Sequence, residues 1–107
     1  MIRKILLAAT LTTLLGGCAP THYTRSNSQM VTLFLKMPNA GKVQFASSFD
    51  HYRVHDAHEA LTGQWEVRVP NNTEFAYFYI IDGQNYVPNC RYKETDDFGS
   101  LNCIYLP

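Results

Sequence analysis

Clustered charge and nucleotide-binding motifs are both missing from this sequence. Only 17% of its 107 residues are charged, the formal net charge at pH 7 is zero, and no stretch is strongly basic. Nucleic-acid-binding proteins contact phosphates with clustered Lys and Arg, so nucleic acid is not an expected partner. There is also no glycine-rich phosphate loop and no serine in a nucleophile elbow. The sequence therefore predicts a protein that is not an enzyme and that binds no cofactor.

An apolar run long enough to span a membrane is also missing. The N-terminal apolar stretch, Ile5–Leu15, is shorter than the ~20 residues that a spanning helix needs. It follows the basic residues Arg3 and Lys4, which is the layout of a secretory signal peptide. The adjoining residues Leu15-Gly16-Gly17-Cys18 resemble the lipobox of bacterial lipoproteins. That resemblance implies cleavage before Cys18 and a lipid on its thiol; the alternative is an ordinary signal peptide with an incidental cysteine.

The lipobox resemblance also implies a location and a domain organisation. Ala19 follows Cys18 where an Asp would signal retention, which implies the outer membrane, with the protein facing the periplasm. We expect a signal peptide over residues 1–17, a lipidated cysteine and linker over 18–30, and one domain over 31–107. Without the signal peptide the chain has seven basic and nine acidic side chains. Acyl chains, rather than electrostatic attraction, would therefore hold the protein at the membrane.

Cysteines are few, and two remain once Cys18 is assigned to the lipid. A pair such as Cys90 and Cys103 in a small exported domain predicts a disulfide. Closing a loop of that size stabilises the fold by about 3 kcal/mol in the chain-entropy model. The alternative, a pair of metal ligands, lacks the second close cysteine pair of a structural zinc site.

Histidines and carboxylates are interleaved in one segment. His51, His55 and His58 stand among acidic residues, a combination that would suit zinc or copper. Histidines at this spacing in a polar loop are commonly solvated, and nothing in the segment suggests the rigid scaffold that a fixed site needs. We therefore expect no metal site.

The clearest secondary-structure pattern is the stretch Phe75–Val87. An apolar run rich in aromatic and β-branched residues ends at Asp82-Gly83 and resumes at Tyr86-Val87. Such residues favour strands, and Asp-Gly favours the positive φ angles of a type I′ hairpin turn. Because the run is apolar on both faces, we expect it to lie inside a sandwich or to have its outer face covered.

Further segments with strand character lie at residues 30–37, 42–47, 65–69 and 101–106. The break at 38–41 is compatible with either a hairpin or a crossing between two sheets. Residues 48–63 show no clear period, with a short helical turn over 56–61 as one option, and 93–97 is expected to be a polar loop. Short strands and almost no predicted helix indicate an all-β sandwich.

Four segments follow one characteristic order and spacing: Ala46–Tyr52, Gly63–Val67, Tyr77–Gly83 and Phe98–Asn102. They resemble the family 48 carbohydrate-binding modules. These include the glycogen-binding domain of the AMP-activated protein kinase beta subunit and the N-terminal domains of glycogen branching and debranching enzymes. The resemblance covers about residues 31–106 and implies an immunoglobulin-like, early-set β-sandwich.

The resemblance also implies where a sugar would bind. Family members stack two tryptophans on sugar faces, and the matching positions here are Tyr52 and Asn85. A lysine of the central strand is matched by Phe78, and the Thr and Asn that contact hydroxyls are matched by Ser100 and Asn102. One stacking position is thus a tyrosine, the other is lost, and the lysine has become aromatic. The candidate carbohydrate site consists of Tyr52, Phe78, Ser100 and Asn102.

Two non-catalytic functions remain open at this stage. In the first, the sandwich binds a carbohydrate through an aromatic surface made of Tyr52 and Phe78. In the second, the sugar site is lost and this aromatic face docks on an envelope protein complex, because exposed aromatic patches often mark interfaces. The expected partners are the membrane, through the lipid, and either a glycan or an envelope protein.

Overall fold

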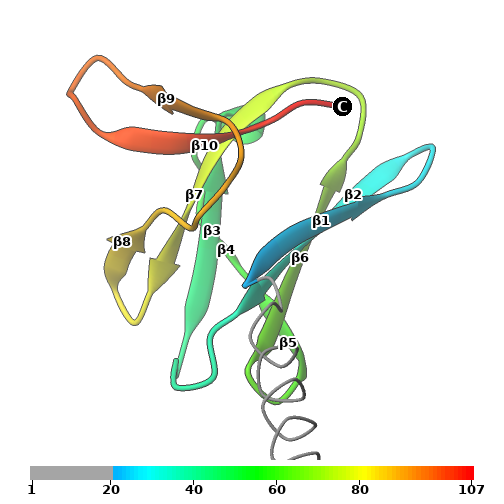
Figure 1. The fold of residues 1–107 in the computed structure, drawn as a ribbon, viewed down its shortest axis with the longest axis vertical. Helices are drawn as coiled ribbons and strands as arrows, with labels where there is room; N and C mark the ends of the chain where they lie inside the picture. The colour runs from blue at the N-terminus through cyan, green and yellow to red at the C-terminus, as the bar shows by residue number, and fades with distance from the viewer. Residues whose placement is uncertain (1–20) are drawn as a thin grey trace, which may run out of the picture.

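The described part of the chain is nearly all β. The structure is a computed structural model and describes residues 21–107. Over these residues it contains ten strands and one 3₁₀ turn, η1 (Ser48–Asp50). The strands form two antiparallel sheets that pack as a sandwich (Figure 1). The all-β, immunoglobulin-like sandwich expected from the sequence is confirmed.

The two sheets contain four and six strands. The first has the order β1 (His22–Ser26), β2 (Met30–Lys36), β6 (Gln64–Pro70) and β5 (His58–Leu61). The second has the order β4 (His55–Asp56), β3 (Val43–Ser47), β7 (Phe75–Ile81), β10 (Leu101–Tyr105) and β9 (Lys93–Thr95), with β8 (Gln84–Tyr86) paired to β7. Because β2 and β3 lie in different sheets, the break at residues 38–41 is a crossing between sheets and not a hairpin.

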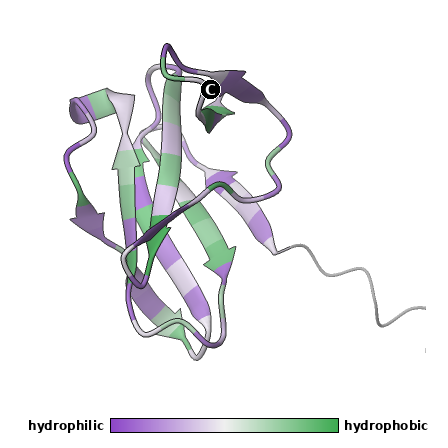
Figure 2. Cartoon of the chain, turned by 90° about the vertical axis from the view of Figure 1, so that its left-hand side faces the viewer, coloured by the Kyte–Doolittle hydropathy of each residue, from purple (hydrophilic) through white to green (hydrophobic). Residues whose placement is uncertain are grey.

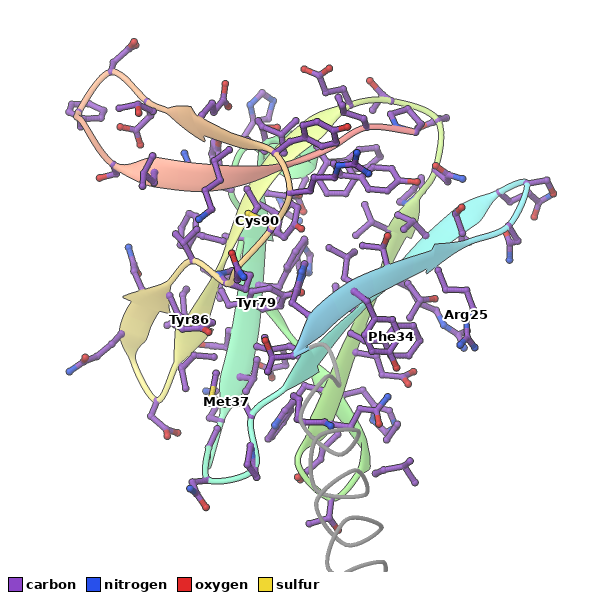
Figure 3. All side chains as sticks on the ribbon, viewed as in Figure 1. Arg25, Phe34, Met37, Tyr79, Tyr86 and Cys90 are labelled. Carbon is purple, nitrogen blue, oxygen red and sulfur yellow. A yellow bond between two sulfur atoms is a disulfide. The ribbon has the colours of Figure 1, made fainter. Side chains whose placement is uncertain are left out.

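The core lies between the sheets and is built from alternate residues of the long strands. Its main members from the two central strands are Val31, Leu33, Leu35, Phe75, Tyr77 and Tyr79. Apolar and polar residues are interspersed along the strands in Figure 2, and Tyr79 points into the space between the sheets (Figure 3). Successive side chains of a strand point to opposite faces, so one face of each strand is buried in the core. β7 is apolar on both faces, and its outer face therefore carries Phe78 and Ile80.

β7 and β8 form the predicted hairpin. Asp82 and Gly83 have φ angles of 49° and 86°, as a two-residue type I′ turn requires. The Asp82 carboxylate also accepts hydrogen bonds from the backbone N–H groups of Gly41, at 3.0 Å, and Lys42, at 2.8 Å. Asp82 therefore reverses the chain and also fixes the crossing that leads into β3.

Three expectations for polar segments are wrong. Residues 18–30 are not all linker, because His22–Ser26 forms β1 and pairs with β2 along its whole length. Residues 56–61 are not helical and instead complete β4 and form β5. The predicted loop at 93–97 begins with strand β9. All these strands are short and mostly exposed, so they carry no apolar period, and their pairing to a neighbouring strand decides their conformation.

The predicted disulfide between Cys90 and Cys103 is confirmed, with Cα atoms 5.9 Å apart. It joins β10 to the segment that precedes β9 and so fixes the base of the β9–β10 hairpin. The lipobox and Cys18 lie outside the described residues. Within residues 21–107, no helix is long and apolar enough to cross a membrane.

Candidate functional site

Phe78 lies where two strands part on one side of β7. β10 pairs with β7 over Phe75–Tyr77, whereas β8 pairs with it over Tyr79–Ile81. These two neighbours diverge between the pairings, and the β9–β10 hairpin extends away from β8 (Figure 1). On its other side Phe78 pairs with Ala46 of β3. The side chain of Phe78 therefore belongs to the outer face of the six-stranded sheet, opposite to the core residues Tyr77 and Tyr79.

Tyr52 stacks on Phe78. The two ring centroids are 6.1 Å apart with an interplanar angle of 24°, and Tyr52 is 42% exposed while Phe78 is half-buried. Tyr52 belongs to the loop after η1, and its backbone N–H donates to the Ser47 carbonyl at 2.7 Å. His51 and Tyr52 have φ angles of 60° and 62°, a left-handed conformation that bulky residues rarely adopt. Such strain persists where the surrounding structure enforces it and is common at binding sites.

The other two predicted site residues are placed differently. Cys103 pairs with Tyr77, so Asn102 shares the outer face of the sheet with Phe78. Asn102 is only 5% exposed. Ser100 is exposed and lies in the β9–β10 turn, where its backbone N–H donates to the Asp96 carboxylate at 3.0 Å. The structure thus brings Tyr52 and Phe78 into contact, leaves Asn102 beneath the surface, and puts Ser100 on the hairpin.

Two further surface residues are not among the predicted site residues. Asn85 of β8 pairs with Ile80, shares the outer face with Phe78, and is exposed. Phe98 lies in the β9–β10 turn and is 93% exposed. A phenylalanine between Asp97 and Gly99 in an otherwise polar turn is the sequence pattern that could have indicated it.

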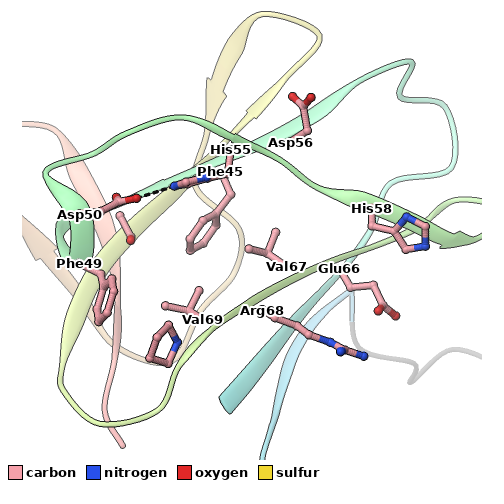
Figure 4. Close-up of a pocket in the computed structure, with 12 residues that line it drawn as sticks. Phe45, Phe49, Asp50, His55, Asp56, His58, Glu66, Val67, Arg68 and Val69 are labelled. Carbon is pink, nitrogen blue, oxygen red and sulfur yellow. Dashed lines mark hydrogen bonds and ion pairs between the residues drawn. The ribbon is translucent and has the colours of Figure 1, made fainter. Parts of the chain in front are cut away.

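A separate cleft of about 690 Å³ opens between β3 and β4 on one side and β6 on the other (Figure 4). Its apolar lining includes Phe45, Val67 and Val69. At its rim, His55 Nε2 lies 2.5 Å from Asp50 Oδ2. This hydrogen bond from His55 lowers the pKa of the Asp50 carboxyl below its usual value. Asp50 Oδ1 is buried and has no hydrogen-bond partner.

Among the histidines of residues 21–107, only His22 of β1 packs against core side chains and is largely buried. Its Nε2 atom lies 3.2 Å from the Tyr79 hydroxyl and 3.5 Å from the Tyr77 hydroxyl. Burial lowers the pKa of His22 to about 4 and raises the pKa of both tyrosine hydroxyls. The imidazole is therefore neutral at pH 7, and the cluster attaches β1 to the second sheet without any buried charge.

The interleaved histidines do not converge. His51 follows η1, His55 belongs to β4 and His58 to β5. Throughout residues 21–107, no three His, Cys, Asp or Glu side chains are arranged to hold a metal ion.

Comparison with known proteins yields no match, either to a protein-family model or to a curated protein. The resemblance to family 48 modules therefore depends on the four sequence segments and on what their residues do in the fold. The surface features that bear on function are the Tyr52–Phe78 stack, the exposed β9–β10 hairpin and the cleft.

Proposed function

We propose that this protein is a non-catalytic bacterial outer-membrane lipoprotein, anchored by a lipid on Cys18, whose sandwich binds a carbohydrate in the periplasm. The observation that carries the proposal is the stack of the exposed Tyr52 ring on Phe78. A flat aromatic face complements the apolar C–H face of a pyranose ring. The resemblance to family 48 modules supports a sugar-stacking role for the same position, Tyr52.

The polar groups on this face of the sheet suit an uncharged ligand. Asn85 and Gln44 both lie opposite Ile80, on neighbouring strands, and so share the outer face with Phe78. Side-chain amides both donate and accept hydrogen bonds, as sugar hydroxyls require. With a single exposed ring, Tyr52, the surface offers one stacking position, and we expect weak binding to a short stretch of glycan.

Retention on insoluble polysaccharides tests the proposal. The detergent-solubilised protein would be mixed in parallel with insoluble α-glucan and with peptidoglycan. Tyr23→Ala is a matched control, because Tyr23 is 37% exposed and stacks on Phe34 of the other sheet. We expect retention of the wild type and of Tyr23→Ala, and loss of retention for Tyr52→Ala. Failure of the wild type to bind either polymer, or equal retention of the two variants, would refute the carbohydrate function.

The anchor has its own test. Cells expressing the protein would be fed an azide-bearing fatty acid, and label would be followed on the purified chain. We expect label on the wild type in the outer-membrane fraction and none on Cys18→Ser. Label that survives the substitution would contradict lipidation at Cys18.

A second function, docking on an envelope protein complex, is favoured by one observation. Phe98 is 93% exposed and Leu101, on the same hairpin, is 51% exposed. Exposed apolar surface often marks a protein contact. A photo-crosslinking amino acid at position 98 should capture a defined partner in cells, whereas the same group at Tyr23 should not. Equal crosslinking from both positions would refute docking through the β9–β10 hairpin.

A further inference from the structure

β1 is attached to the sandwich by few contacts. It is an edge strand of the four-stranded sheet and pairs with β2 alone (Figure 1). The side chains of residues 23–26 are exposed, and the Tyr23 ring lies on Phe34, on the outer face of the sheet. His22 is therefore the only side chain of β1 that is not exposed, and it contacts the Tyr77 and Tyr79 hydroxyls of the other sheet.

The turn that follows β1 is fixed separately. The Asn27 side chain accepts hydrogen bonds from the backbone N–H groups of Gln29, at 2.8 Å, and Met30, at 2.7 Å. The Asn71 side chain donates to the Asn27 carbonyl at 2.8 Å. Detachment of β1 therefore leaves this turn in place, and the strand can move as a flap that ends at Ser26.

The groups that face His22 are neutral or positive. β7 presents the hydroxyls of Tyr77 and Tyr79, and Leu35 of β2 stands opposite His22. A hollow of about 340 Å³ beside His22 is lined by the charged residue Arg91. The other titratable side chains of its lining are Tyr23, Tyr77, Tyr92 and Tyr105.

A protonated His22 has no counter-charge in this environment. Within residues 21–107, the lining of the hollow contains no carboxylate, and the sequence of residues 1–20 has no Asp or Glu. Burying an unpaired cation is costly, and the Arg91 side chain on the same hollow adds repulsion. Protonation of His22 therefore favours a state in which the imidazole is in water.

The size of this effect follows from the two pKa values of His22. Burial lowers its pKa to about 4 in the docked strand, whereas a solvated imidazole has its ordinary value of 6.5. The released strand binds the proton more tightly, so acid shifts the equilibrium toward release. From pH 7.5 to pH 5, the ratio of released to docked strand should rise roughly 30-fold.

We propose that β1 is an acid-released strand: protonation of His22 detaches residues 22–26 while the remaining strands of both sheets stay folded. The consequence for the membrane rests on the proposed lipid on Cys18. Three residues separate Cys18 from His22, and release adds the five residues of β1 to this tether. Five extended residues span roughly 17–18 Å, so acid would let the sandwich move farther from the membrane surface.

Hydrogen–deuterium exchange of the detergent-solubilised protein tests the release. Backbone amides of β1, β5 and β7 would be followed at pH 7.5 and pH 5, after correction for the intrinsic pH dependence of exchange. We expect the opening constant of β1 to rise roughly 30-fold at pH 5 and to change little in low urea, because a local opening exposes little surface. The opening constant of β7 should be much smaller and should rise steeply with urea. Opening of β1 with the same constants and urea dependence as β7 would overturn the proposal.

β5 provides the matched comparison, because it is the other edge strand of the same sheet and carries an exposed histidine, His58. Its opening constant should stay within about 2-fold between the two pH values. His22→Gln should abolish the pH response of β1, since Gln cannot take up the proton, whereas His58→Gln should keep it. An equal response of β1 and β5, or a response of β1 that survives His22→Gln, would overturn the proposal.

If His22→Gln does not fold, the comparison of β1 with β5 and β7 in the wild type decides the proposal. These measurements do not depend on the lipid or on a carbohydrate. Their failure is therefore distinguishable from failure of the fatty-acid labelling or of the polysaccharide retention.

Discussion

Tyr52 stacks on Phe78 with ring centroids 6.1 Å apart, and the same arrangement recurs on the other sheet, where Tyr23 stacks on Phe34 at 4.7 Å. The two stacks differ in their surroundings. The Arg25 guanidinium lies 5.6 Å from the centre of the Phe34 ring (Figure 3). Over residues 21–107, no cation lies over Phe78 in this way. The Tyr52–Phe78 stack, which is proposed to bind sugar, therefore has no cation over it in the described part of the chain. The Tyr23–Phe34 stack is the matched control in the binding experiment.

The Tyr52–Phe78 contact should stabilise the fold measurably. In a double-mutant cycle of Tyr52→Ala and Phe78→Ala, we expect a coupling of about 0.5–1.5 kcal/mol, as for other aromatic pairs. Free energies of unfolding from urea titrations give the coupling. The cycle of Tyr52→Ala with Phe34→Ala should give a coupling near zero, because Tyr52 packs on the six-stranded sheet whereas Phe34 belongs to β2 of the other sheet. A similar coupling in both cycles would mean that the stack is not a specific contact.

Asp82 should matter through its carboxylate as well as its turn conformation. Asp82→Ala loses the hydrogen bonds from Gly41 and Lys42 and places Ala at a φ of 49°, so we expect a loss of about 2–3 kcal/mol. Asp82→Asn tolerates the left-handed conformation and keeps one acceptor oxygen, so its loss should be about 1 kcal/mol. Urea denaturation of both variants provides the comparison. Equal losses would contradict a role for the turn conformation, and no loss for Asp82→Asn would contradict a contribution from the charge of the carboxylate.

The Cys90–Cys103 disulfide closes a short loop, with a sequence separation of 13. Reduction of this bond should lower the free energy of unfolding by about 3 kcal/mol. For a domain this small, that corresponds to a Tm lower by roughly 10–20 °C. Thermal melts followed by circular dichroism, with and without dithiothreitol, measure the change. The double variant Cys90→Ala/Cys103→Ala should melt at the reduced protein's temperature and be insensitive to the reductant. An unchanged Tm on reduction of the wild type would contradict a stabilising role for the bond.

Stability should fall in mild acid because of His22. Burial lowers its folded-state pKa to about 4, below the ordinary value of 6.5, so the unfolded chain takes up a proton that the fold excludes. The neutral, buried His22 makes its full contribution to the free energy of unfolding above pH 6.5, and this contribution is lost as the pH falls from 6.5 toward 4. The free energy of unfolding should therefore be about 2 kcal/mol lower at pH 5 than at pH 7.5.

Urea titrations at the two pH values test this dependence. His22→Gln should remove about 2 kcal/mol of the difference between them, since Gln cannot take up the proton. His58→Gln, at an exposed position of β5, serves as the control and should retain the full difference. Identical pH profiles for wild type and His22→Gln would show that His22 is not responsible.

The candidate site was only partly readable from the sequence. The resemblance to family 48 modules selected Tyr52 and Phe78, and the fold brings them together through the strained turn at His51. It also selected Asn102, which the fold buries, and Ser100, which the hairpin carries. A matching position in a sequence specifies neither the exposure of a side chain nor the direction of a loop, because both depend on neighbouring strands.

The sequence by itself determined the all-β class, the long strands, the Asp82-Gly83 turn and the Cys90–Cys103 pair. Each of these features has a local sequence pattern that predicts it: period-two hydropathy or an apolar run, a residue that tolerates positive φ, or a single pair of cysteines besides Cys18. Only the tertiary structure decided that His22–Ser26 is a strand, that the chain crosses between sheets at residues 38–41, and that a cleft opens beside Asp50. These features depend on backbone hydrogen bonds and on which edges stay uncovered, and neither leaves a pattern in the side chains.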